Sequence, residues 1–224
     1  MKNCAVNKIF FLALVLLAGC QADLTIPKDQ VQKTLLEYGA KHPEREVLIE
    51  TDLGNITLQL FEDTPLHRAN FIRAIKAGYY NSTSEFYRIV SSFMVQGGAL
   101  RAKKTNYLVP NEIKAGHFHK TGALAMAHYD ENNPQHDSSP TEFYIVTGRR
   151  YLSEDLEDLA QTGNYSAAQL EHYEKIGGAA NLDGSYTVFG EVISGMEVVE
   201  KIGALKTNED ESPKQKVKFK ISCK

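Results

Sequence analysis

The chain has 224 residues, of which 42% are hydrophobic and 24% are charged, and its formal net charge is −3 at pH 7. This length allows one full hydrophobic core with appendages and leaves little room for a second core. Positive and negative residues are interspersed, so there is no extended basic field for a phosphate backbone, and nucleic acid is excluded as the expected partner. No apolar run reaches the length of about eighteen residues that a membrane-spanning helix needs.

The first residues have the layout of an export signal. Lys2 and Lys8 give a positive start, an uninterrupted apolar run follows from Ile9 to Ala18, and small residues end it. This order is typical of a secretory signal peptide. We therefore predict that residues 1–19 form a signal peptide that is removed on export.

The end of this signal, Leu17-Ala18-Gly19-Cys20, resembles the lipobox of bacterial lipoproteins. Cleavage at a lipobox leaves the cysteine as the acylated first residue, so the resemblance implies a lipid anchor on Cys20. The expected location is the bacterial cell envelope, with the protein facing the periplasm or exposed at the surface. An ordinary signal peptide that contains a cysteine is the alternative. Because Cys4 would leave with the signal peptide and Cys20 would be acylated, only Cys223 would remain as a free thiol. No internal disulfide is therefore expected.

Residues 20–45 are mostly polar and contain two prolines. One short helix-like segment, residues 31–38, is ended by Gly39. We interpret residues 20–45 as a tether that raises the domain off the lipid surface. A docked N-terminal helix is the competing interpretation.

From Val47 the hydrophobic pattern alternates, which predicts strands. Residues 47–51 and 56–60 are expected to form a hairpin. Thr64 and Pro65 then predict the start of a helix that Gly78 ends. Further strands are expected at residues 86–90, 93–96, 123–127, 143–147, 187–193 and 216–222, the last of which alternates strictly between apolar and mostly basic residues.

Two helical regions interrupt the later strands. Residues 153–178 predict two short helices, the second opened by the capping box from Ser166 to Gln169, and residues 196–202 predict one more. Many short strands with a few separated helices favour a mostly β, closed antiparallel barrel over residues 46–224. The region 153–178 is expected to be a helical insertion outside this barrel.

The most informative segment is Phe86-Tyr87-Arg88-Ile89-Val90-Ser91-Ser92-Phe93-Met94-Val95-Gln96-Gly97-Gly98. An arginine within an apolar strand is unusual, because an unpaired buried guanidinium is costly. Gln96 follows at even spacing and is expected on the same face of the sheet as Arg88. By composition alone, an arginine on the exposed face of a half-buried strand remains the alternative.

This segment resembles the cyclophilin signature, which is an aromatic, any residue, Arg, two aliphatics, and then Phe-Met-x-Gln-Gly-Gly. Residues 122–127, 142–145 and 182–190 resemble further blocks of that family, in family order. The resemblance runs from about Val47 to Ile221. It implies an eight-stranded antiparallel barrel capped by two helices and a peptidyl-prolyl cis–trans isomerase. The implied substrates are proline-containing segments of unfolded exported proteins, whose folding the enzyme would assist, and we expect a monomer without a cofactor.

Isomerisation explains why such residues are needed. Amide resonance gives the prolyl bond a barrier of about 18–20 kcal/mol, and rotation requires the nitrogen to regain its lone pair. A fixed guanidinium that donates to this nitrogen stabilises the twisted state more than the planar one. The resemblance implies that Arg88 is the catalytic residue and that Gln96 orients it. The implied substrate-binding residues are Phe93, Met94, Ala127, His128, Glu142, Tyr144, Leu182 and Tyr186.

Departures from the family pattern leave alternatives open. Glu142 stands where the family usually has glutamine, and a pair between Glu142 and Arg88 would favour a peptide-binding or holding module with little turnover. A metal site at His117, His119, His128 and His136 is another alternative. Because no carboxylate or cysteine stands at diagnostic spacing, we interpret these as surface or loop histidines and expect no metal.

Overall fold

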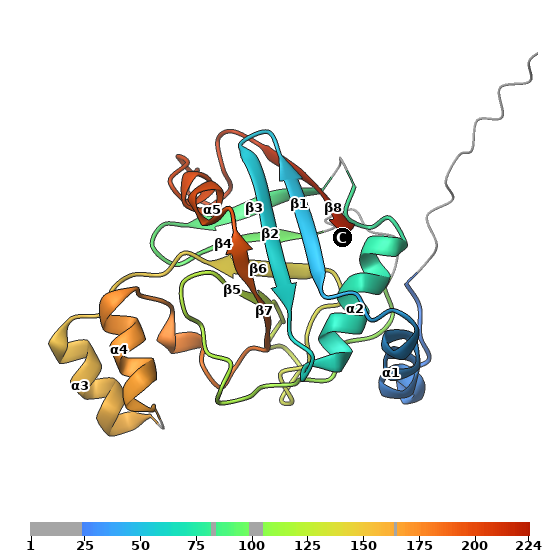
Figure 1. The fold of residues 1–224 in the computed structure, drawn as a ribbon, viewed down its shortest axis with the longest axis horizontal. Helices are drawn as coiled ribbons and strands as arrows, with labels where there is room; N and C mark the ends of the chain where they lie inside the picture. The colour runs from blue at the N-terminus through green and yellow to red at the C-terminus, as the bar shows by residue number, and fades with distance from the viewer. Residues whose placement is uncertain (1–23, 82–83, 99–104, 164) are drawn as a thin grey trace, which may run out of the picture.

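The computed structural model describes residues 24–81, 84–98, 105–163 and 165–224. Eight antiparallel strands close into a barrel in the order β1-β2-β7-β5-β6-β4-β3-β8 (Figure 1). The strands are β1 (Glu46–Thr51), β2 (Gly54–Leu60), β3 (Ser84–Val90), β4 (Met94–Gly98), β5 (Ala123–Met126), β6 (Glu142–Val146), β7 (Val188–Ser194) and β8 (Val217–Cys223). The predicted fold class is therefore confirmed, and β1 and β2 form the expected hairpin.

The alternating pattern of the strands fills the barrel interior with apolar side chains. Along β8, Val217, Phe219 and Ile221 are buried while the lysines between them are exposed. Phe219 contacts Phe86 at a ring-centroid distance of 4.8 Å and Phe143 at 5.7 Å. The period-two pattern thus separates one buried face from one solvated face in the closed sheet.

Helices α2 (Pro65–Lys76) and α5 (Met196–Gly203) lie on opposite sides of the barrel (Figure 1). Each buries an apolar face, with Phe71 of α2 packing edge-on against Phe189 inside the barrel. On α5, Val198, Val199 and Ile202 enter the same core. These are the two capping helices that the resemblance implied.

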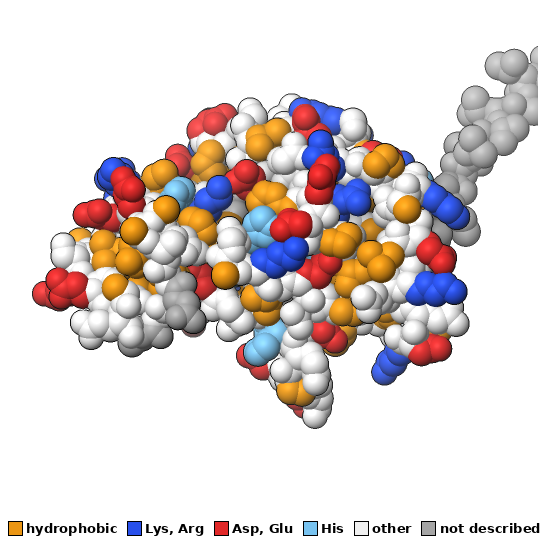
Figure 2. All heavy atoms as spheres, turned by 60° about the horizontal axis from the view of Figure 1, so that its bottom comes forward, with side chains coloured by type: hydrophobic (Ala, Val, Ile, Leu, Met, Phe, Trp, Pro, Cys, Tyr) orange, Lys and Arg blue, Asp and Glu red, His pale blue; other side chains and the backbone are white. Residues whose placement is uncertain are grey.

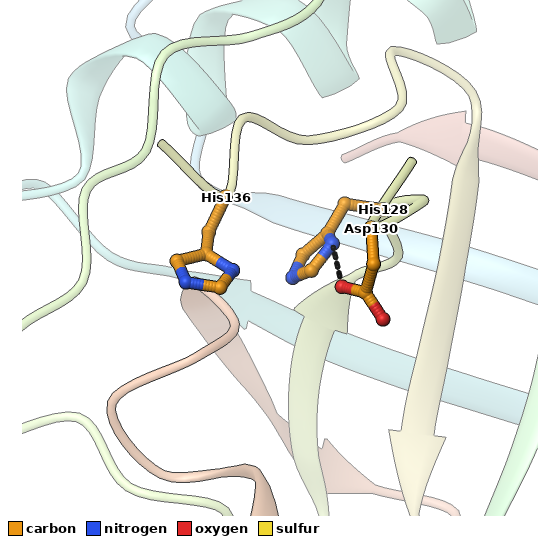
Figure 3. Close-up of side chains that lie close together, drawn as sticks. All are labelled: His128, Asp130 and His136. Carbon is orange, nitrogen blue, oxygen red and sulfur yellow. Dashed lines mark ion pairs between the residues drawn. The ribbon is translucent and has the colours of Figure 1, made fainter. Parts of the chain in front are cut away.

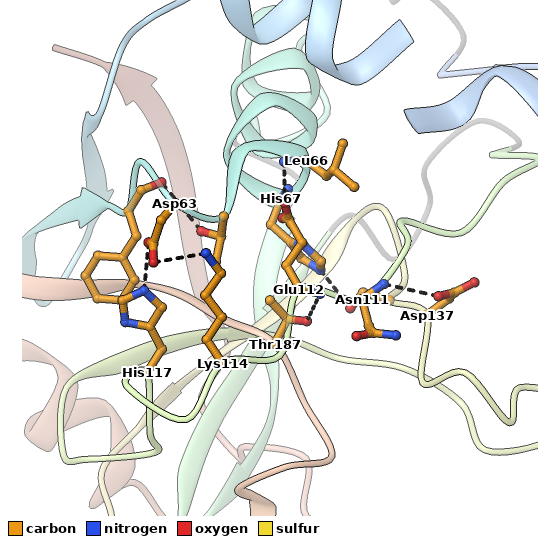
Figure 4. Close-up of polar contacts among 12 residues, drawn as sticks. Asp63, Leu66, His67, Asn111, Glu112, Lys114, His117, Asp137 and Thr187 are labelled. Carbon is orange, nitrogen blue, oxygen red and sulfur yellow. Dashed lines mark hydrogen bonds and ion pairs between the residues drawn. The ribbon is translucent and has the colours of Figure 1, made fainter. Parts of the chain in front are cut away.

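The start of α2 is satisfied by a distant carboxylate and not by the residue that the sequence suggested. Thr64 precedes the helix, but its side chain makes no capping hydrogen bond. The backbone amides of Leu66 and His67 instead donate to the two carboxylate oxygens of Glu112, at 3.0 and 2.9 Å (Figure 4). A negative charge at this end also complements the helix dipole. Glu112 therefore holds the connection between β4 and β5 against the start of α2.

The N-terminal segment is docked on the barrel unit. It consists of a short turn, η1 (Lys28–Gln30), and helix α1 (Val31–Lys41), which packs against α2. Leu24, Ile26 and Leu35 are almost completely buried in the main core. The tether interpretation is therefore wrong for residues 24–45, where the docked helix is found. Residues 20–23, with Cys20, and the predicted signal at residues 1–19 lie outside the described residues.

Residues 153–175 form the expected two-helix excursion, α3 (Ser153–Thr162) and α4 (Ala167–Lys175), at one end of the molecule (Figure 1). The predicted capping box opens α4, because Ser166 accepts from the Gln169 amide and Gln169 accepts from the Ser166 amide. The excursion leads through Gly178 into η2 (Ala180–Leu182). Within the described ranges, every helix is too short or too polar to cross a bilayer.

The visible surface mixes both signs of charge. Figure 2 shows lysine and arginine side chains interleaved with aspartate and glutamate, with hydrophobic side chains scattered among them. The face in view therefore carries no large patch of a single sign of charge.

Candidate functional site

A cavity of about 430 Å³ opens on the barrel surface. Its lining contains every side chain that the sequence implicated in catalysis or peptide binding, together with two further tyrosines. The lining residues are Tyr87, Arg88, Phe93, Met94, Gln96, Ala127, His128, Tyr129, Glu142, Tyr144, Leu182 and Tyr186.

Strand register sets the polar row of this site. Arg88 on β3 pairs with Gln96 on β4, and Gln96 pairs with Tyr144 on β6. Directly opposed residues in a sheet project to the same face, so the three side chains line up across neighbouring strands. The register shifts between Phe86 and Arg88, which marks a bulge. The bulge lets Tyr87 and Arg88, although consecutive, both face the cavity.

Two partners hold the Arg88 guanidinium. Its Nη1 donates to Gln96 Oε1 at 3.2 Å, and its Nε donates to Glu211 Oε2 at 2.6 Å. Glu211 lies in the loop between α5 and β8, with a φ of 63°, and its carbonyl oxygen accepts from the Ile89 amide at 2.9 Å. Among the described residues Nη2 has no hydrogen-bond partner, so this end of the guanidinium is available to a ligand.

Glu142 does not form an ion pair with the Arg88 guanidinium. Its Oε1 accepts hydrogen bonds from the hydroxyls of Tyr87, at 3.2 Å, and Tyr129, at 3.3 Å. Tyr87 also accepts from Gln96 Nε2 at 2.8 Å, which fixes the amide so that its oxygen faces Arg88. Burial, and then the Glu142 carboxylate, raise the pKa of Tyr87, so its hydroxyl keeps its proton. The interpretation in which Glu142 pairs with Arg88 is therefore wrong.

The apolar part of the cavity is a small second core. Met94, Ala127 and Tyr144 are almost completely buried there, and Phe93, Leu182 and Tyr186 pack against them while remaining partly exposed. The Tyr144 and Tyr186 rings meet edge to face at a centroid distance of 5.9 Å. Such a pocket suits a ring of the size of proline.

A buried hydrogen-bond chain supports Tyr144 from behind. His119 Nδ1 lies 2.7 Å from Asp183 Oδ1, and His119 Nε2 lies 3.0 Å from the Tyr144 hydroxyl. Because the carboxylate only accepts, Nδ1 carries the proton and Nε2 accepts from Tyr144. Tyr173 on α4 donates to the other Asp183 oxygen. His119 lies in a loop, as one part of the interpretation had it, but it is completely buried and not at the surface.

Comparison with known proteins identifies the family. Residues 46–223 match the profile described as "Cyclophilin type peptidyl-prolyl cis-trans isomerase/CLD". The chain belongs to this family. A peptidyl-prolyl cis-trans isomerase from Acinetobacter baylyi is 32% identical over 77% of this chain and 81% of the relative. Peptidyl-prolyl cis-trans isomerase A from Dickeya dadantii is 34% identical over 78% of each chain.

Solved cyclophilin structures share the fold. The crystal structure of a Cryptosporidium parvum cyclophilin-type isomerase aligns with a TM-score of 0.61 at 19% identity, over 81% of this chain and 98% of that one. A crystal structure of the same isomerase in the presence of the dipeptide Ala-Pro aligns with a TM-score of 0.60 at 20% identity. The expected eight-stranded cyclophilin barrel is thus confirmed, and the enzyme class is that of its curated relatives.

Three residues of this cyclophilin site, Tyr87, Tyr129 and Glu211, escaped the sequence interpretation. Tyr87 occupies the position of the signature at which any residue is allowed, so the motif carried no signal for it. Glu211 lies 123 positions after Arg88, in a polar stretch that reads as an ordinary turn. The sequence also did not predict the hydrogen-bond chain that runs from Glu142 through Tyr87 and Gln96 to Arg88.

Proposed function

We propose that this cyclophilin catalyses prolyl isomerisation in exported proteins and that Arg88 is its catalytic residue. One observation carries the proposal: the Arg88 guanidinium, held at Nε and Nη1, stands at the edge of a cavity of about 430 Å³ that has an apolar part. A preorganised cation needs no reorganisation when the imide nitrogen regains its lone pair. No nucleophile or proton transfer is required, because only conjugation is lost and restored.

The energetic demand is modest. An acceleration of about 10⁵ corresponds to about 7 kcal/mol of transition-state stabilisation. Orientation of the peptide and one cation that interacts more strongly with the twisted state than with the planar state together supply energies of this size. Phe93, Met94 and Tyr144 would seat the proline ring, which brings its nitrogen toward Arg88.

The test is the exchange rate of a short Xaa-Pro peptide, followed by NMR on wild type, Arg88→Ala and Arg88→Lys. Arg88→Ala should lower kcat/KM by about 10²–10³, the typical cost of one preorganised donor. Arg88→Lys should recover little, since a point charge on a flexible stem lacks the planar fork that two partners hold. Arg149→Ala, which loses the pair with Asp155 and a contact with the Tyr151 ring but does not line the cavity, is the control.

Two outcomes would contradict this assignment. A folded Arg88→Ala variant as active as wild type would remove Arg88 from the mechanism. A wild type that binds the peptide without accelerating exchange would favour a holding module, in which the Glu211 carboxylate keeps the cation engaged.

We also propose that the enzyme is anchored in the bacterial cell envelope through a lipid on Cys20, where exported proteins would be its substrates. The support is the sequence Leu17-Ala18-Gly19-Cys20 after a short apolar run. Mass spectrometry of the protein extracted from membranes should find Cys20 as an acylated N-terminus. A soluble, unmodified mature protein would contradict the proposal.

A further inference from the structure

Three potential metal ligands meet beside the peptide cavity. His128, Asp130 and His136, hereafter the His128 cluster, each place one ligand atom within 4.8 Å of the other two (Figure 3). His128 Nδ1 lies 3.4 Å from Asp130 Oδ1. The three residues follow β5 within one loop, and the hydrogen bonds described above for Arg88, Gln96 and Glu142 do not use the Asp130 or His136 side chains.

Two ring nitrogens in this cluster have no hydrogen-bond partner among the described residues. His128 Nε2 lies 3.0 Å from the Ser185 carbonyl oxygen. A carbonyl only accepts, so Nε2 carries the proton, and in the neutral ring Nδ1 carries a lone pair. Within the described part of the chain, the Nδ1 atoms of both His128 and His136 are buried and make no hydrogen bond.

This arrangement is unfavourable unless a positive charge completes it. The His128 side chain is 1% exposed, so water does not readily solvate its Nδ1. A buried acceptor without a partner loses the hydrogen bond that water would give it in the unfolded chain. The neighbouring Asp130 carboxylate adds a second acceptor that faces the first. A cation between these atoms would satisfy both.

The loop that carries the cluster is built around one buried side chain. Asn133 is 7% exposed, its Nδ2 donates to the carbonyls of Tyr129 and Asp137, and its Oδ1 accepts from the Asp137 amide. The His136 amide donates to the Asn133 carbonyl at 3.1 Å, and His136 has a φ of 56°. These contacts hold His136 in a backbone conformation that most residues avoid.

We propose that the His128 cluster binds a divalent transition-metal ion of the zinc type. Two imidazole nitrogens and one carboxylate suit such an ion, whereas Mg²⁺ and Ca²⁺ prefer oxygen ligands. Bonds of about 2.1 Å place the ligand atoms of a tetrahedral ion about 3.4 Å apart. The pair formed by His128 and Asp130 already has this separation, and the His136 ligand atom, within 4.8 Å of both, would have to move closer on binding. A fourth position stays open.

The ion would act on the peptide cavity through His128, a consequence that rests on the proposed isomerase function. The His128 ring lines the cavity and stacks on Tyr186 at a centroid distance of 4.1 Å. Its Nε2 also holds the Ser185 carbonyl, next to Tyr186. A bound ion would fix this wall and place a positive charge beside the groove, so peptide turnover should fall when zinc is bound.

The binding test uses the full-length chain, stripped of metal and purified without a histidine tag. Calorimetric titration with Zn²⁺ should show one site, and Mg²⁺ should show none. His136→Ala and Asp130→Asn should each weaken zinc binding at least about tenfold. His42→Asn, which changes a histidine outside the cluster, should leave the titration unchanged.

The outcomes separate the site from its effect on catalysis. Absence of zinc binding, or a site unaffected by both cluster variants, would overturn the proposal whether or not the chain is an isomerase. Zinc bound at the cluster should lower kcat/KM several-fold in wild type, a chelator should restore it, and His136→Ala should be insensitive. An unchanged kcat/KM at saturating zinc would overturn the coupling to the groove.

Discussion

The N-terminal segment and the α3–α4 excursion are both additions to the barrel, but they are attached in different ways. Leu24, Ile26 and Leu35 of the first enter the main core. The excursion has one fully buried side chain among those described, Tyr173, and α3 buries none. Tyr173 donates one hydrogen bond to Asp183, and Asp183 in turn accepts from His119 behind the pocket residue Tyr144.

This difference separates a stabilising attachment from a positioning one. Apolar burial contributes to the free energy of unfolding roughly in proportion to the area removed from water, wherever the functional site lies. A hydrogen-bond chain adds little burial but fixes the direction of a side chain. We therefore expect changes in α1 to affect stability alone, and changes in α4 to affect the pocket.

The largest expected effect is on the N-terminal side. Leu35→Ala should lower the free energy of unfolding by about 2–5 kcal/mol, because it removes a fully buried side chain from the core. Urea unfolding measures this, and kcat/KM per folded molecule should be unchanged. Leu36→Ala, at a neighbouring position that is 43% exposed, is the matched control. Equal midpoints for the two variants would mean that α1 does not dock in solution.

The second prediction concerns Tyr173. Tyr173→Phe keeps the ring but removes the donor to Asp183, which should cost about 1.5–3 kcal/mol, typical of a hydrogen bond to a charged group. The peptide KM should also rise, since Asp183 holds His119 and His119 holds Tyr144. Tyr38→Phe, on α1, should change neither quantity much. An unaltered KM in Tyr173→Phe would contradict the expectation that the α3–α4 excursion positions Tyr144 in the pocket.

A third prediction compares this route with the loop between α5 and β8. Glu211→Gln should lower kcat/KM several-fold, because Arg88 loses the charged acceptor that fixes its Nε. Unfolding should hardly change, since both side chains are more than a third exposed. A rise in kcat/KM would show instead that the carboxylate masks the cation.

The smallest effect is expected for α3. The sequence predicted that the whole region 153–178 lies outside the barrel, but removal of all of it would also delete Tyr173. Replacing residues 153–162 alone with a short Gly/Ser linker should change the unfolding free energy by less than about 1 kcal/mol and leave kcat/KM intact. Loss of a single cooperative unfolding transition would show that α3 supports the barrel.

The sequence alone determined the parts of this protein that depend on neighbours along the chain. Alternation predicted the strands, the Ser166 and Gln169 pattern predicted the start of α4, and even spacing predicted that Arg88 and Gln96 share a face. These features follow from backbone periodicity and from hydrogen bonds between residues three or four positions apart. The resemblance to the cyclophilin family added the ten predicted site residues, which the barrel brings into one cavity.

Only the tertiary structure decided which partner each polar group takes. Glu112 caps a helix 46 positions earlier, and Glu211, not Glu142, pairs with Arg88 across 123 positions. The tertiary structure likewise decided that α1 docks on the barrel and that His119 is buried. No local pattern encodes these pairs, because exposed-looking carboxylates and histidines have the same sequence signature whether they end in water or against a distant strand. Closure of the barrel brings such groups together, and the cost of leaving buried polar atoms unpaired then selects the partners.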